Sequence, residues 1–74
     1  MPENVKFEET EKKDTYDIFN GEDQLGTLTV DREEQKKSKM LFEENFSGNR
    51  KNTKKRLIQW YFDYVMSPMS PMTA

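Results

Sequence analysis

Residues 53–66 read TKKRLIQWYFDYVM, and this stretch contains the strongest helical pattern of the chain. It holds the only tryptophan and two of the three tyrosines. Its apolar side chains recur at intervals that place them on one face of an α-helix. These side chains are Leu57, Ile58, Tyr61, Tyr64 and Val65. The spacing predicts a helix over residues 53–66 whose apolar face the remaining segments must cover.

The flanks of this helix suggest where it begins and ends. Residues 47–52 read SGNRKN, which is the composition of a loop, so Thr53 is the expected N-cap, with Asn52 as the alternative. Residues 67–74 read SPMSPMTA, and their prolines cannot continue a helix. We therefore expect one small domain over residues 1–66, followed by a disordered tail rich in Ser, Pro and Met over residues 67–74.

The first half of the chain predicts strands, because apolar and polar residues alternate or β-branched and aromatic residues are dense. The predicted strands cover residues 4–9, 15–20 and 25–30. The dipeptide Asn20-Gly21 predicts a hairpin turn, which Glu22 and Asp23 extend to a loop of about four residues. Gly26 inside the returning strand predicts a bulge or the close approach of another backbone, such as the crossing helix.

Residues 32–45 allow two interpretations. They contain good helix formers, but residues 32–39 hold no apolar side chain, so two helical turns there would bury nothing. We favour a strand over residues 39–44, with residues 31–37 as a charged turn or loop. The predicted core then comprises Tyr16, Ile18, Leu28, Val30, Met40, Phe42, Leu57, Ile58, Tyr61 and Val65.

The composition argues against several classes of function. The 74 residues include no cysteine and no histidine, which excludes disulfides, Cys/His zinc sites and His-dependent nucleophilic catalysis by this chain. The adjacent acidic pairs lack the ligand spacing of a calcium loop, and there is no Gly-rich phosphate loop. We expect no enzyme, no catalytic residue, no metal site and no cofactor. The lack of a long apolar run predicts a cytoplasmic location without membrane association.

Charge is divided unevenly along the chain. Residues 1–34 hold eleven acidic and four basic side chains, whereas residues 35–74 hold three acidic and eight basic ones. The net charges are therefore −7 and +5. This division predicts a bipolar surface with one electropositive end, unless the two halves attract each other within the fold.

Five cations fall within seven residues just before and inside the predicted helix. They are Arg50, Lys51, Lys54, Lys55 and Arg56. Cations in a first helical turn oppose the helix dipole, and unfavourable local chemistry often marks a functional site. These residues are our candidates for binding nucleic acid or another polyanion.

Two large aromatic residues of the helix, Trp60 and Phe62, lie off its main apolar stripe. They can close a broad core face, or they can anchor a protein partner. We keep both as partner-binding candidates.

The sequence therefore predicts an α+β fold, an antiparallel meander of three to four strands with one C-terminal helix packed on one face. The expected function is a small non-enzymatic binding or adaptor module. It acts through a protein partner or through self-association as a homodimer, using helix aromatics or an exposed strand edge. The alternative is a module that binds nucleic acid or another polyanion through residues 50–56.

Overall fold

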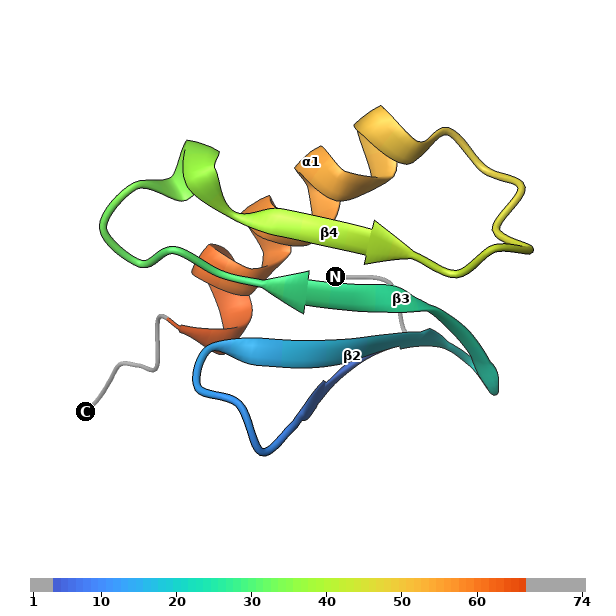
Figure 1. The fold of residues 1–74 in the computed structure, drawn as a ribbon, viewed down its shortest axis with the longest axis horizontal. Coiled ribbons are helices and arrows are strands. Elements are labelled where there is room, and N and C mark those ends of the chain that lie inside the picture. The colour runs from blue at the N-terminus through green and yellow to red at the C-terminus, as the bar shows by residue number, and fades with distance from the viewer. Residues whose placement is uncertain (1–3, 67–74) are drawn as a thin grey trace.

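The computed structural model describes residues 4–66, which fold into a four-stranded sheet and one α-helix (Figure 1). The strands are β1 Val5–Glu9, β2 Thr15–Asn20, β3 Asp23–Thr29 and β4 Lys39–Phe42. They form one antiparallel sheet in the order β1-β2-β3-β4. Helix α1, Arg50–Trp60, crosses one face of this sheet and continues into the π-helical turn η2, Tyr61–Val65. The predicted α+β meander with one C-terminal helix is confirmed, and the meander has four strands.

The β2–β3 hairpin is tighter than predicted. Asn20 pairs with Asp23, so only Gly21 and Glu22 form the loop, rather than four residues. Gly21 has φ 65°, a value that glycine adopts without steric cost. A positive φ at the first of two loop positions is typical of a type II′ turn, whose twist matches that of the paired strands. Of the two acidic residues after the glycine, Glu22 therefore stays in the loop and Asp23 belongs to the returning strand.

Gly26 allows β4 to lie against β3. The pairing shifts between Ile18, which faces Gly26, and Phe19, which faces Gln24, so Leu25 is the extra residue of a β-bulge. A Cβ on Gly26 would collide with the Leu41 carbonyl oxygen and would lie 2.8 Å from the Phe42 Cα. The predicted bulge and the close approach of another backbone are both confirmed, and that backbone belongs to β4 rather than to the helix.

The connection between β3 and β4 is a charged loop, as predicted. Its short 3-10 turn η1, Gln35–Lys37, buries no residue. The Asp31 carboxylate accepts 2.9 Å hydrogen bonds from the backbone N–H groups of Glu33 and Glu34, and these bonds lower the pKa of Asp31. Ser38 is buried, and its hydroxyl accepts a 3.0 Å bond from the Asp31 N–H. The chain then enters β4, so the strand interpretation of this region is confirmed.

The core lies between the sheet and the helix and matches most of the predicted set. Seven of the ten predicted residues are buried, namely Tyr16, Ile18, Leu28, Val30, Leu57, Ile58 and Tyr61. Met40 and Val65 are partly buried against this cluster. Phe42 is outside the cluster, and its prediction is wrong. Its ring stacks on Phe46 with the centroids 4.6 Å apart, because the loop after β4 folds back over the end of the strand.

The helix begins earlier than predicted. The Asn49 side chain accepts a 2.8 Å hydrogen bond from the Asn52 N–H, and Asn49 is therefore the N-cap in place of Thr53 or Asn52. Asn49 has the extended backbone of a cap residue, and no Gly or Pro follows it before Trp60. The loop prediction is consequently wrong for residues 50–52. Lys54, Lys55 and Arg56 lie beyond the first turn, where the helix dipole opposes them less.

The helix also ends differently, because its last turn widens. The Met66 N–H donates a 2.8 Å bond to the Tyr61 carbonyl, the i→i+5 pattern of a π-helix. Tyr61 and Val65 remain on the sheet side, but Tyr64 is rotated outward and is 58% exposed. The placement of Tyr64 on the apolar stripe is therefore wrong. The predicted tail over residues 67–74 lies outside the described residues.

Candidate binding surface

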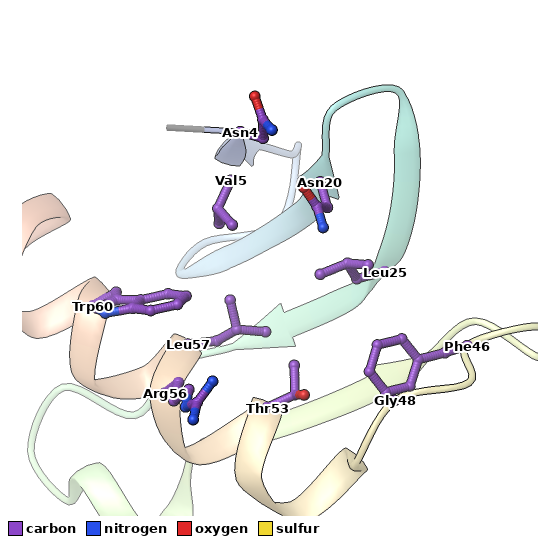
Figure 2. Close-up of a pocket in the computed structure, with 10 residues that line it drawn as sticks. All are labelled: Asn4, Val5, Asn20, Leu25, Phe46, Gly48, Thr53, Arg56, Leu57 and Trp60. Atoms are coloured by element: carbon purple, nitrogen blue, oxygen red, sulfur yellow. The ribbon is translucent and has the colours of Figure 1, made fainter. Parts of the chain in front are cut away.

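A cleft of about 570 Å³ opens between one flank of α1 and the sheet (Figure 2). Four separate parts of the chain enclose it: the start of β1, the β2–β3 hairpin, the loop after β4 and the helix. The lining residues are Asn4, Val5, Asn20, Leu25, Phe46, Gly48, Thr53, Arg56, Leu57 and Trp60.

The helical side of the cleft follows from the spacing of its residues. Thr53, Arg56, Leu57 and Trp60 have the i, i+3, i+4, i+7 separation that places side chains on one flank of a helix. Leu57 is 1% exposed and anchors this flank to the core. Trp60 is partly buried against the core, and its ring extends along the cleft below Val5 (Figure 2).

The opposite side of the cleft depends on the bulge in β3. Leu25 is the extra residue there, and its side chain points into the cleft toward the helix (Figure 2). Leu25 is partly buried against the core cluster, and Phe46 adds a second apolar side chain from the loop after β4. Five of the ten lining residues of the cleft are thus aliphatic or aromatic, and most of the others are polar.

Polar groups lie among these apolar side chains. Arg56 is exposed, and no carboxylate among residues 4–66 forms an ion pair with it. The Asn20 side chain points into the cleft from the end of β2 (Figure 2). The arrangement offers an apolar recess beside one unpaired guanidinium, which suits an apolar side chain next to a carboxylate.

The other predicted cations are distributed around α1 rather than gathered in one patch. Lys51 and Lys55, four residues apart, lie on the flank away from the cleft, where Lys55 borders a second groove with Ile58. Lys54 is partly covered. The Arg50 guanidinium lies 5.6 Å from the centroid of the Phe42 ring. The structure therefore divides the five candidates, Arg56 in the cleft included, among four environments.

None of these five cations forms an ion pair within the described part of the chain. The two ion pairs found there join Arg32 to Asp14 and Lys37 to Glu34. The single acidic residue between positions 45 and 66 is Asp63, whose carboxylate accepts a 3.0 Å hydrogen bond from the Gln59 amide. The positive charge of α1 is consequently not neutralised by direct contacts within residues 4–66.

The two aromatic candidates occupy different positions. Trp60 lines the cleft, whereas Phe62 is partly buried and packs edge-on against Tyr61, with the ring centroids 5.2 Å apart. Both touch the core cluster. Phe62 is thus largely committed to packing, and Trp60 combines packing with access to the cleft.

Sequence reasoning missed the non-helical residues of the cleft. Leu25 lies in the predicted strand over residues 25–30 and Phe46 lies in no predicted element, because the pattern of one segment does not show which other segments line the same cleft. The signal that was present is the helical spacing of Thr53, Arg56, Leu57 and Trp60, which separates Arg56 from Lys51 and Lys55.

Comparison of this chain with protein-family models, with curated proteins and with solved structures found no match. Within residues 4–66, no helix has the length and apolar character needed to cross a membrane. The same residues contain no cluster of three or more acidic side chains placed to hold a metal ion.

Proposed function

We propose that this protein is a non-enzymatic binding module whose cleft beside α1 accepts a segment of a protein partner. The observation that supports the proposal is the combination of apolar side chains in the cleft, including Trp60, with the exposed Arg56 guanidinium, which forms no ion pair within residues 4–66. A rigid aromatic ring beside a recess and a free arginine are features that recur in binding hot spots.

The chemistry of the cleft specifies the partner. An apolar side chain can fill the space between Leu25, Leu57 and Trp60, while a neighbouring Asp or Glu pairs with Arg56. A hydroxyl or amide of the partner can bond to Asn20 at the hairpin end of the cleft. The expected ligand is therefore a short acidic segment with an apolar anchor, and a basic segment would be repelled by Arg56 and by the other helix cations.

Selection from a displayed random-peptide library tests this proposal without knowledge of the natural partner. We expect enrichment of peptides in which Leu, Ile, Phe or Trp lies next to Asp or Glu. Because Trp60 is the only tryptophan of the chain, binding of a tryptophan-free selected peptide should shift its fluorescence. Failure to enrich any peptide family, or enrichment of basic peptides, would contradict the proposal.

A matched pair of charge reversals locates the binding site. Arg56→Glu should weaken binding of a selected peptide by about tenfold or more, because it replaces attraction with repulsion inside the cleft. Lys51→Glu makes the same change in net charge on the other flank of α1 and should have a much smaller effect. Equal weakening by both variants would mean that overall charge, not the cleft, governs binding.

A second candidate function is binding of nucleic acid or another polyanion. It is favoured by the five α1 cations that lack ion pairs within residues 4–66. A labelled single-stranded DNA oligonucleotide should then bind at low salt with an affinity that falls steeply as salt rises. Lys51→Ala combined with Lys55→Ala should flatten that dependence. Absence of binding at low salt would refute this candidate, and the same double variant should leave peptide binding in the cleft intact.

A further inference from the structure

Strand β4 ends the sheet on one side, and its outer edge is unpaired by any described residue. The Glu43 N–H donates a 2.9 Å hydrogen bond to the Leu25 carbonyl, so Glu43 and Leu25 form a hydrogen-bonded pair between β4 and β3. Hydrogen-bonded and non-hydrogen-bonded pairs alternate along an antiparallel ladder. Lys39 and Leu41 therefore bond to β3, and the backbone N–H and C=O groups of Met40 and Phe42 face the free edge.

The same strand carries an unusually exposed apolar side chain. Leu41 is 77% exposed on the face of the sheet opposite α1, because the alternation that turns Met40 and Phe42 toward the helix turns Leu41 away from it. An edge strand with free backbone groups and an exposed apolar residue is a template for pairing with another strand. The face beside Leu41 is otherwise mostly polar, with Thr27 directly across from it on β3.

We infer that β4 pairs antiparallel with β4 of a second copy of this chain, centred on Leu41. In this register, Met40 of each copy lies opposite Phe42 of the other, so the free N–H and C=O groups meet in pairs that exchange hydrogen bonds in both directions. Leu41 of one copy lies opposite Leu41 of the other, and Lys39 of each copy lies opposite Glu43 of the other. The backbone groups, the apolar contact and the charges are all satisfied by one two-fold arrangement.

Neighbouring registers satisfy these requirements less well. Moving the centre to Met40 places Lys39 opposite Leu41, and moving it to Phe42 places Leu41 opposite Glu43. Each shift sets an apolar side chain against a charge and loses the pair of opposite charges. The sequence KMLFE over residues 39–43 is thus self-complementary about its central leucine. The result is a continuous eight-stranded sheet, twice the four strands of one copy, with both helices on the same face.

The other edge of the sheet fits a second copy less well. On the helix-free face, β1 presents the charged side chains of Lys6 and Glu8, and it has no exposed apolar residue to bury there. The inferred dimer is independent of the cleft beside α1, so both surfaces can act at once.

Charge reversal with rescue tests the inferred pairing. By sedimentation velocity between about 10 μM and about 1 mM protein, the wild-type chain should show a reversible monomer–dimer equilibrium. Lys39→Glu and Glu43→Lys should each raise the dimer dissociation constant by roughly tenfold, because each places like charges opposite one another at both symmetry-related positions. The double variant Lys39→Glu with Glu43→Lys restores opposite charges and should dimerise like the wild type.

Leu41→Lys should give a folded monomer, since Leu41 is exposed within one copy and supports the fold little. Lys6→Glu on β1 and Arg56→Glu in the cleft are controls that should leave the dissociation constant unchanged. A wild-type chain that stays monomeric throughout this range would overturn the inference. A dimer whose dissociation constant is unchanged by the substitutions of Lys39, Leu41 and Glu43 would also overturn it. A dimer that is weakened only by Lys6→Glu would do the same.

Discussion

The Arg50 guanidinium lies 5.6 Å from the centroid of the Phe42 ring, so the first residue of α1 is held over the last residue of β4. The Phe42 ring also stacks on Phe46, with centroids 4.6 Å apart. These contacts close the loop over residues 43–49 and fix where the helix begins relative to the sheet. Arg50 therefore has a structural contact that explains its position, in contrast to the cations that follow it.

Replacing Arg50 should cost stability, whereas replacing its neighbour should not. Arg50→Ala removes a cation–π contact and should lower the free energy of unfolding by about 0.5 to 1 kcal/mol. Lys51→Ala removes a first-turn cation that opposes the helix dipole, so it should be neutral or slightly stabilising. Urea unfolding curves of the two variants measure the difference. Equal effects would show that the Phe42 contact contributes nothing beyond charge.

Gly26 should be among the least tolerant positions of the chain. In Gly26→Ala the new methyl group meets the Leu41 carbonyl oxygen and the Phe42 Cα, both backbone atoms of β4 that cannot rotate away. We expect a loss of about 3 kcal/mol or more, enough to unfold much of a small domain. Thermal unfolding followed by circular dichroism measures the change.

Gly21→Ala is the control for backbone conformation alone. Its φ of 65° disfavours alanine, but no atom lies within 4 Å of the added methyl group. The expected cost is about 1 to 2 kcal/mol. A Gly26→Ala variant no less stable than Gly21→Ala would contradict the close packing of β3 on β4.

The sheet was predictable from the sequence because the patterns that specify its strands and hairpin lie within short segments of the chain. Alternating residues define β1 to β4, and the glycine after Asn20 marks the hairpin, so strand order and most of the core follow from neighbouring positions. The choice of strand over helix for residues 39–42 also followed from a local count of apolar residues. The errors at the hairpin and at Tyr64 each concern a single turn. The hairpin loop is shorter than predicted, and the last helical turn is wider, which changes the side chains that are covered.

The cleft and the separation of the helix cations were not predictable in the same way. Reading the cations as one run ignored the ~100° rotation between consecutive residues of a helix, which divides Arg56 from Lys51 and Lys55. The placement of Leu25 and Phe46 across the cleft from α1 depends on where the helix crosses the sheet. That crossing is set by tertiary packing of Leu57, Ile58 and Tyr61, which no local pattern specifies.

The observed helix start predicts a specific pattern of cap mutations. Asn49→Ala removes the side-chain acceptor for the Asn52 N–H and should cost about 1 kcal/mol of stability. Thr53→Ala lies within the helix, where alanine is the better helix former, and should be close to neutral. Chemical unfolding of both variants decides between the two caps. A larger loss from Thr53→Ala would move the start of the helix to the position expected from the sequence.

Stability at high pH should depend on the core tyrosine Tyr16. Its pKa is raised from about 10 to about 12, mainly by burial and in smaller part by the adjacent Tyr61 hydroxyl and the Glu9 carboxylate, while Arg32 acts in the opposite direction. Folding therefore favours the neutral phenol. The resulting stabilisation is fully present below about pH 10 and is lost as the pH rises to about 12, because the unfolded chain releases the Tyr16 proton first.

The loss from Tyr16 should be on the order of 2 kcal/mol across that interval. Urea unfolding at about pH 8 and about pH 11 should show a smaller decrease in stability for Tyr16→Phe than for the wild type. Tyr64→Phe, at a position that is 58% exposed, should follow the wild type. All other ionisable groups except the substituted tyrosine are the same in the three proteins, so the comparison isolates the Tyr16 phenol. Parallel pH dependence in Tyr16→Phe and Tyr64→Phe would show that ionisation of Tyr16 does not limit alkaline stability.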